Sequence, residues 1–209
     1  MSTEQKKKSQ KTLSRAEAAK ETQATILDAA VRLFGLKGFK QVSIEQIAEA
    51  AGVAKGTIYI YYKSKKALFR AVCQNSVETF MALAKKTYDA DWPSHGQRAQ
   101  EIILSKFLYY QGLLSLSPFV KDLFEAQARI GQDLFDEANQ RYLEMLASTL
   151  STAEQAGELE LEARGTTAME LANLLFVAAH GPNMELGTQV YERQLRGILA
   201  AMVRGFSTR

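Results

Sequence analysis

Residues 43–62, SIEQIAEAAGVAKGTIYIYY, place hydroxyl, basic and aromatic side chains around a tight Ala-Gly-Val turn. In a helix that follows this turn, Ile58 and Tyr62 lie one turn apart and share a face, which we expect to pack against the core. Gly56 and Ile60 then point almost directly away from the core, because successive residues are about 100° apart around a helix. The sequence therefore predicts a short helix with one small, mixed and exposed face.

The exposed side chains of this helix have the chemistry to read bases in a major groove. Gly56 permits close approach of the backbone, Thr57 offers a methyl and a hydroxyl group, and Ile60 offers apolar contact. The surrounding side chains that can reach phosphate oxygens are Lys55, Tyr59, Tyr61, Lys63 and Lys65. The N-terminus of the preceding helix, capped by Ser43, presents free N–H groups to an anion. If the domain bound no DNA, the two tyrosines would be ordinary surface aromatics.

The ends of the helices that position these groups are marked in the sequence. Ser43 and Gln46 have the spacing of a capping box, and Gly52 is placed to end that helix. Two helices joined by so short a turn have the spacing of a helix-turn-helix. We expect an earlier helix to begin at Ser14 and to end at Gly38. Three short helices thus precede a longer one.

The remainder of the chain also predicts helices. Apolar residues recur at spacings of three and four as far as residue 206, and hairpin signals such as Asn-Gly are absent from the sequence. The expected fold class is therefore all-α, with about nine helices.

The charge of the chain is divided by position. Residues 1–70 contain 14 Lys and Arg and 6 Asp and Glu, a net charge of +8, whereas residues 71–209 contain 12 and 17, a net charge of −5. A basic N-terminal part suits a polyanion such as DNA, because Lys and Arg release the counterions condensed on phosphates. A solvated basic face without a partner has the same composition, so charge alone does not decide.

Residues 26–69, ILDAAVRLFGLKGFKQVSIEQIAEAAGVAKGTIYIYYKSKKALF, resemble the N-terminal DNA-binding domain of the TetR/AcrR family of bacterial transcriptional regulators. The resemblance implies a homodimeric repressor that binds a palindromic double-stranded DNA operator and is released by a small-molecule effector. The DNA contacts that it implies are Ser43, Lys55, Gly56, Thr57, Tyr59, Tyr61 and Lys65. This sequence departs from the family pattern at Gln23, Ala54, Ile60 and Tyr61.

The resemblance also implies an organisation in domains. We expect a flexible basic tail over residues 1–13, the helix-turn-helix domain over 14–70 and a helical ligand-binding and dimerisation domain over 71–209. Residues 167–180 are apolar nearly all round, which calls for burial on two sides. Together with the striped helix expected over 188–206, they are the candidate homodimer interface. A helix buried entirely within one chain remains the alternative.

Aromatic residues are concentrated in the middle helices, where most should be core. The candidates to line an effector pocket are Phe107, Tyr110, Phe124, Tyr142, Met145 and Phe176. We expect few buried charges among these helices, which favours an apolar or neutral effector, with Asp122, Glu125 and Arg129 as candidates for the mouth of its pocket.

Several other classes of protein are disfavoured by the sequence. His95, His180 and Cys73 stand singly, without the spacing of a catalytic or metal site, so we expect neither an enzyme nor a metal or cofactor. No apolar run approaches the length of a membrane span, and a lone cysteine fits the reducing cytoplasm. The alternative function left open is a helical ligand-binding or adaptor protein that does not bind DNA.

Overall fold

The computed structural model describes the backbone of residues 3–114, 117–181 and 187–208, and side chains within 14–113, 117–181 and 187–208. In this described part the chain forms nine α-helices and one short 3-10 helix, which confirms the all-α prediction. The chain divides into two compact units, Met1–Cys73 with Pro118–Ile130 and Gln74–Ser117 with Gly131–Arg209.

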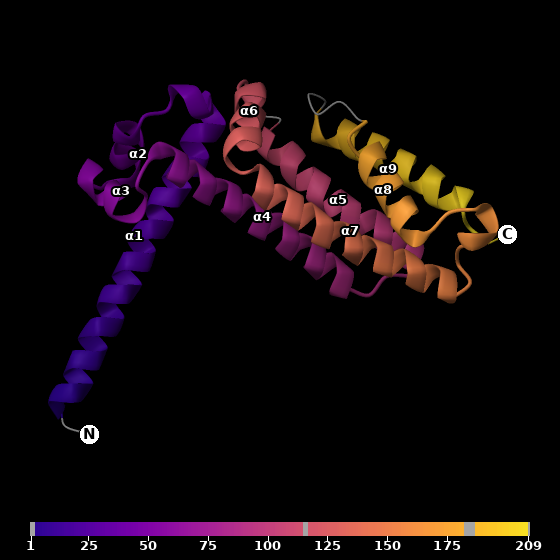
Figure 1. The fold of residues 1–209 in the computed structure, drawn as a ribbon, viewed down its shortest axis with the longest axis horizontal. Coiled ribbons are helices and arrows are strands. Elements are labelled where there is room, and N and C mark those ends of the chain that lie inside the picture. Colours follow the sequence, from indigo (N-terminus) through magenta and orange to yellow (C-terminus); the bar gives the residue numbers. More distant parts are fainter. Residues whose placement is uncertain (1–2, 115–116, 182–186, 209) are drawn as a thin grey trace. The chain divides into compact units, whose positions relative to one another are not determined.

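The first unit is made of helices from two separate parts of the chain (Figure 1). Its elements are α1 (Thr3–Gln41), α2 (Ile44–Ala51), α3 (Lys55–Tyr61), the first part of α4 (Lys65–Asp89) and α6 (Val120–Ile130). The expected start of the first helix at Ser14 is wrong, since α1 already begins at Thr3. The physical reason is that residues 3–13 contain neither Gly nor Pro and are rich in Lys and Gln, which favour helices. The side chains of the basic tail lie outside the described residues.

Gly38 breaks α1, as its sequence position predicted. Its φ of 75° and ψ of 168° belong to a region that is essentially open to glycine alone, and they differ from the left-handed helical conformation expected there. A side chain at this position would also lack space, because a Cβ atom would lie 2.6 Å from Oδ2 of Asp122 and 3.0 Å from Cβ of Phe119. Both the turn and the close packing of α6 therefore require glycine.

The core of the first unit holds α2 and α3 in place. The three rings of Phe34, Phe39 and Phe69 pack together, with centroid separations of 4.8–5.7 Å. Ile47 of α2 and Ile58 of α3 are fully buried. Apolar burial on this scale stabilises by about 1.5–3 kcal/mol for each large side chain, so the short helices depend on this core rather than on their own propensity.

Helix α6 groups with the first unit, although the expected boundary after residue 70 assigned it to the second domain. Asp122 accepts a hydrogen bond from the backbone N–H of Lys40 at 2.9 Å, and Glu125 accepts one from the Lys40 ammonium at 2.9 Å. The guanidinium of Arg70 donates to the carbonyl of Ile130 at 2.9 Å. The two acidic residues are therefore engaged within this unit, which is a correction to their expected place at a ligand pocket.

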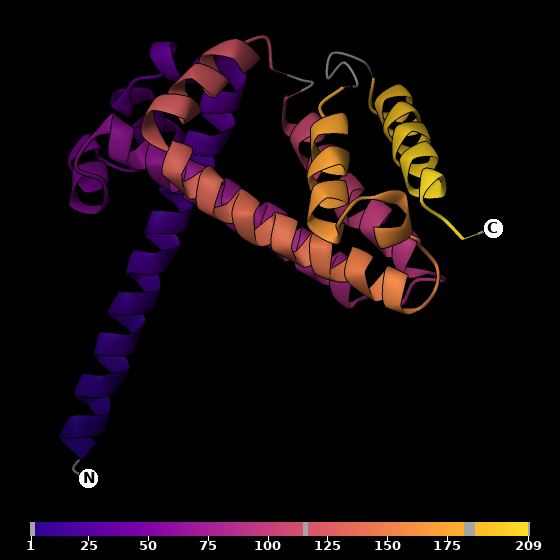
Figure 2. The ribbon, with the colours of Figure 1, turned by 45° about the vertical axis from the view of Figure 1, so that its right-hand side comes forward.

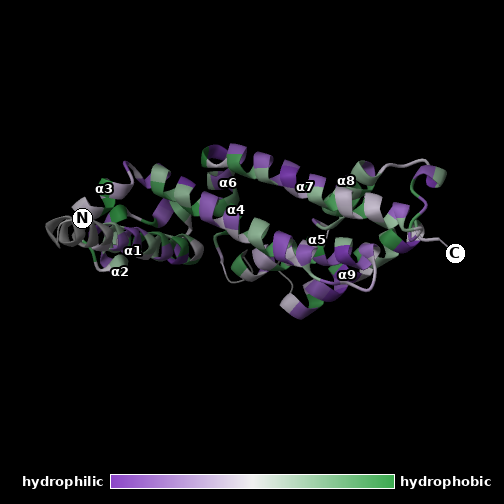
Figure 3. Cartoon of the chain, turned by 90° about the horizontal axis from the view of Figure 1, so that it is seen from below, coloured by the Kyte–Doolittle hydropathy of each residue, from purple (hydrophilic) through white to green (hydrophobic). Residues whose placement is uncertain are grey.

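The second unit is a helical bundle, which can be followed in Figure 2. Its elements are the remainder of α4, α5 (His95–Leu114), α7 (Gln132–Gln155), the 3-10 helix η1 (Glu162–Arg164), α8 (Ala168–Ala178) and α9 (Thr188–Gly205). Helix α7 packs against α5 and α8, and α9 packs against α5 and α8. Hydrophobic and hydrophilic residues alternate along α7 (Figure 3), as expected for a helix with one buried face.

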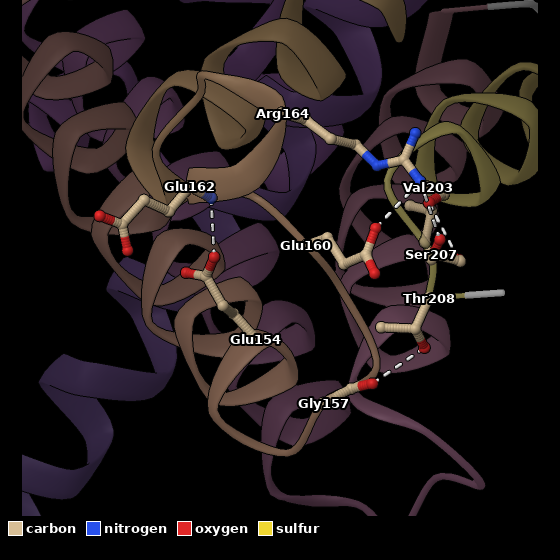
Figure 4. A network of polar contacts seen from close by, with 8 residues as sticks. All are labelled: Glu154, Gly157, Glu160, Glu162, Arg164, Val203, Ser207 and Thr208. Carbon is tan, nitrogen blue, oxygen red and sulfur yellow. Dashed lines mark hydrogen bonds and ion pairs between the residues drawn. The ribbon is translucent and has the colours of Figure 1, made fainter.

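The connection between α7 and α8 is fastened to the end of α9 (Figure 4). Leu159 and Ser207 form an isolated antiparallel bridge. Arg164 binds both the carboxylate of Glu160 at 3.2 Å and the carbonyl of Ser207 at 3.3 Å, and Thr208 donates its hydroxyl to the carbonyl of Gly157 at 2.9 Å. These contacts fix the C-terminal end of the bundle. None of the helices described is long and apolar enough to cross a membrane.

Candidate nucleic-acid interface

Local hydrogen bonds define the α2–turn–α3 unit in the positions that the sequence predicted. The hydroxyl of Ser43 accepts from the N–H of Gln46 at 3.2 Å, and the side chain of Gln46 accepts from the N–H of Ser43 at 2.9 Å, which completes the capping box. Gly52 ends α2 in the left-handed conformation, with φ 66° and ψ 28°. Ala54 caps α3 without a side-chain hydrogen bond, as its departure from the family pattern implies.

The two faces of α3 differ in exposure as predicted. Ile58 is fully buried and Tyr62 nearly so, whereas Ile60 is 79% exposed and Tyr59 is 46% exposed. Gly56 is exposed as well, and nothing lies within 4 Å of the position that a Cβ atom would take there. The outer face of α3 is thus open to a partner, and the backbone at Gly56 can be approached closely.

The remaining candidates lie around this face and differ in how exposed their side chains are. Thr57 and Tyr61 are half-buried on the flanks, Ser43 is half-buried at the start of α2, and Lys63 is exposed just beyond the end of α3. The structure therefore brings these four residues to the neighbourhood of α3. Their contact with DNA remains a prediction.

Lys55 and Lys65 are engaged by residues of the chain itself. The ammonium of Lys55 forms an ion pair with Glu45 of α2, whose hydrogen bond to Lys55 lowers the pKa of the carboxyl group to about 2. Lys65 donates to the carbonyl of Lys40 at 3.3 Å and lies 4.5 Å from the ring centre of Phe39, and burial lowers its pKa. Of the three lysines predicted to bind phosphate, Lys63 is therefore the one least engaged by residues of the chain itself. At Lys55, phosphate would have to compete with Glu45.

Most of the expected effector-pocket residues lie in the second unit. Phe107 and Tyr142 are buried, Tyr110, Met145 and Phe176 are half-buried, and the ring of Phe176 lies 5.8 Å from that of Phe107 and 6.1 Å from that of Tyr142. Burial raises the pKa of Tyr142 well above its usual value, and its hydroxyl donates to the carbonyl of Ile102 at 2.9 Å.

Phe124 does not belong with these residues. It lies on α6 in the first unit, where α6 packs against α1, and its side chain is exposed. A pocket of about 510 Å³ does occur in the second unit, beside the ion pair of Arg196 with Glu101, but the predicted pocket residues do not line it.

Buried charge is scarce in the described part of this unit, as expected, and Lys106 is the exception. This side chain of α5 is only 5% exposed, and desolvation lowers its pKa to about 7. Sequence reasoning missed it, although helical periodicity was available as a signal. Lys106 lies three and four residues after the buried Ile103 and Ile102, on the apolar face of α5.

One face of α8 is covered within the chain and the other is not. Leu171, Ala172 and Leu175 are buried, whereas Leu174 is 51% exposed and Val177 is 68% exposed. On α9, the stripe predicted from the sequence faces the bundle, with Leu195, Leu199 and Val203 buried. The apolar face of α8 is therefore the part of the candidate dimer interface that this chain alone leaves exposed.

Within the described residues, no cluster of three or more His, Cys, Asp or Glu side chains could hold a metal ion. His95 begins α5, and His180 packs its ring against Phe107 and Phe176. Cys73 is buried, and desolvation raises the pKa of its thiol to about 11, which disfavours the thiolate form at neutral pH.

Known proteins are similar in sequence to the helix-turn-helix part of the chain. Residues 26–72 match the family described as bacterial regulatory proteins, tetR family. The HTH-type transcriptional regulator AcrR of Shigella flexneri is 40% identical over 75 residues, which cover 36% of this chain and 34% of that protein. The fatty acid metabolism regulator protein of Bacillus subtilis is 27% identical over 137 residues, covering 65% of this chain and 69% of its own length. The first of these matches thus spans only about a third of the relative.

Solved structures share the fold over most of the chain. A transcriptional regulator from Cytophaga hutchinsonii has a TM-score of 0.71 at 17% identity, covering 88% of this chain and 97% of its own. The transcriptional regulator FadR from Bacillus subtilis, in complex with stearoyl-CoA, has a TM-score of 0.60 at 19% identity, covering 88% and 98%. Residues 26–72 thus match the tetR family of bacterial regulatory proteins, and most of the chain shares its fold with solved transcriptional regulators.

Proposed function

We propose that the chain is a cytoplasmic transcriptional repressor that binds a palindromic DNA operator as a homodimer and is released by a small-molecule effector. The observation that carries the proposal is the exposed face of α3. Gly56 and Ile60 face outward while Ile58 fixes the helix to the core, in a capped helix-turn-helix. Small and apolar groups of this kind can enter a major groove and contact bases.

The division of roles follows from chemistry and exposure. Thr57 and Ile60 read bases, whereas Lys63, Tyr59 and Tyr61 bind phosphates. Lys55 and Lys65 add to phosphate binding once DNA competes with their present partners, which are Glu45 and the Lys40 carbonyl.

The homodimer is proposed to form through α8 and α9. The side chains of Met169, Leu174 and Val177 on α8 form an apolar face that is exposed to water, which is unfavourable for a surface of this kind. A two-fold interface places the same face of a second copy against it, so that one surface buries both. Such a dimer would present two copies of α3 to successive half-sites of an operator.

The effector is proposed to bind among the aromatic residues of the second unit. The similar fold of FadR in complex with stearoyl-CoA, and the similarity to a fatty acid metabolism regulator, support a small-molecule ligand for this unit. Release then requires that the effector bind more tightly to a state whose α3 helices do not match successive grooves.

The experiment that tests the DNA-binding proposal is a fluorescence-anisotropy titration of the full chain against duplexes that tile the DNA beside its own gene. We expect one duplex to bind at least about a hundredfold more tightly than unrelated DNA, with affinity falling steeply as salt rises. Equal affinity for every duplex, or binding that ignores salt, would refute the proposal and favour a helical ligand-binding or adaptor protein.

Matched variants separate base reading from phosphate binding. Thr57→Ala should lower the preference for the operator over a singly mismatched duplex by about fivefold. Lys63→Ala should weaken all duplexes alike and reduce the salt slope by about one. Lys86→Ala, which removes an exposed lysine from the second unit, is the control and should leave both quantities unchanged. Equal loss of discrimination from Thr57→Ala and Lys63→Ala would contradict the assigned roles.

A further inference from the structure

Lys106 carries its ammonium group into the interior of the second unit. The Nζ atom lies 4.5 Å from the ring centre of Phe80 on α4, 4.6 Å from that of Tyr142 on α7 and 4.5 Å from that of Phe176 on α8. Three helices besides its own thus supply an aromatic cage around one amine. Ring faces attract a cation, by about 0.5–2 kcal/mol each according to burial.

The cage does not satisfy the hydrogen-bonding capacity of the amine. A protonated amine has three N–H donors, and Asn139 accepts one of them at 2.5 Å through its side-chain oxygen. Among the described residues, no carboxylate forms an ion pair with Lys106. Burial of a charge without a counter-ion is costly, and desolvation accordingly lowers the pKa of Lys106 to about 7.

The other groups that face the amine cannot supply the missing negative charge. Tyr142 is a neutral phenol whose hydroxyl already donates to the carbonyl of Ile102. Asn139 is a neutral amide, and Phe80 and Phe176 present only rings. A methionine or leucine would fill such a position without the cost of desolvating a charge, so the amine is best explained by a ligand that it recognises.

The aromatic cluster continues from the amine to the surface of the unit. The ring of Phe176 lies 5.1 Å from that of His180, which is exposed, and His180 also lies 4.8 Å from the ring of Phe107. An apolar molecule that displaces or separates these rings would reach Lys106 by a path lined with aromatic side chains.

We propose that Lys106 binds the carboxylate of an effector whose remaining surface is apolar, the ammonium and Asn139 holding the acid group while the surrounding rings hold the tail. This proposal rests on the small-molecule effector of the proposed function and names its chemical class. A carboxylate supplies the counter-ion and the acceptors that the amine lacks, in a charge-assisted hydrogen bond shielded from water. A neutral alcohol with the same tail supplies neither the charge nor the same strength of bond.

The test compares three ligands that differ only in the head group: decanoate, decanol and decyltrimethylammonium, each below its micelle concentration. A second series, 4-phenylbutanoate and 4-phenylbutanol, replaces the tail by an aromatic one. Isothermal titration calorimetry on the full chain at pH 7 should give at least one carboxylate a Kd about tenfold or more below that of its alcohol. Absence of carboxylate binding in both series overturns the proposal, as does tighter binding of the trimethylammonium ligand.

Two variants assign the preference to the amine. Lys106→Met keeps an unbranched side chain that is one atom shorter and removes its charge. It should reduce the preference for the carboxylate to less than about twofold, while the alcohol binds as well as before. Lys86→Met removes an exposed charge elsewhere in the same unit and should keep the wild-type preference. An undiminished preference in a folded Lys106→Met chain overturns the assignment.

A spectroscopic readout does not depend on affinity. In protein labelled with 13C at the lysine Cε atoms, the signal that Lys106→Met removes should titrate near pH 7, and the bound carboxylate should raise that midpoint while the alcohol leaves it unchanged.

The outcomes distinguish this inference from the proposed function. Operator binding by wild-type chain without carboxylate preference refutes the inference and leaves the regulator intact. A carboxylate preference that requires Lys106, in a chain that binds no specific DNA, refutes the regulator instead.

Discussion

Replacing Lys106 with methionine should make the folded chain more stable at neutral pH and remove a pH dependence of its stability. The side chain is 5% exposed, and its pKa is lowered from 10.5 to about 7 by desolvation. Between those two pH values the unfolded chain holds a proton at this amine more readily than the folded chain does. The free energy of unfolding contributed by Lys106 therefore rises as pH increases from about 7 toward 10.5.

The magnitude follows from the same two pKa values. Because the folded chain binds the proton of Lys106 less tightly than the unfolded chain does, this amine lowers the free energy of unfolding. The reduction is about 4 kcal/mol at pH 7 and falls to about 1 kcal/mol at pH 10. The hydrogen bond to Asn139 and the rings of Phe80, Tyr142 and Phe176 offset part of that reduction. We expect Lys106→Met to raise the free energy of unfolding by about 1–3 kcal/mol at pH 7, and the gain to shrink steadily toward pH 9.5.

The assay is urea unfolding of wild type and variant at several pH values from 6 to 9.5, at one protein concentration, followed by circular dichroism. The difference between the two chains isolates the amine, because the other titrating groups are common to both. A difference that stays constant within about 0.5 kcal/mol over this range would show that the pKa of Lys106 is not lowered in the folded chain. It would then remove the physical basis of the carboxylate proposal.

Three further changes probe other parts of the molecule. Gly38→Ala should destabilise the chain by about 1–3 kcal/mol in urea unfolding, because the position has a positive φ and a Cβ atom there would approach Asp122. Gly35→Ala, in open space on α1, is the control and should not destabilise the chain. Equal effects of the two changes would contradict the conformational argument. Glu45→Gln should release Lys55 and tighten DNA binding about two- to fivefold at low salt, measured by anisotropy, and a gain no larger than that of Glu49→Gln would exclude competition by Glu45. Val177→Asp should shift the chain from dimer to monomer in sedimentation velocity, while Gln140→Asp on α7 should not; an unchanged dimer would place the interface elsewhere.

Features set by neighbouring residues in the chain were predictable from the sequence. The capping box of Ser43 and Gln46 and the end of α2 at Gly52 depend on groups within four residues of one another. The shared face of Ile58 and Tyr62 follows in the same way from the periodicity of a helix. Helical geometry fixes such relations before any packing occurs. The open face of α3, and with it the candidate DNA-reading side, is for that reason a property of the local sequence.

Contacts between distant parts of the chain were decided only by the tertiary structure. The pairing of α6 with Lys40, the burial of Lys106 among rings from three other helices, and the exposed half of α8 each depend on segments separated by many residues. Periodicity states which face of a helix is apolar but not which helix will cover it, because burial is favourable against any apolar surface of suitable shape. The sequence by itself therefore determined the helices and the outward face of α3, while packing decided which charges became buried and which apolar face stayed exposed.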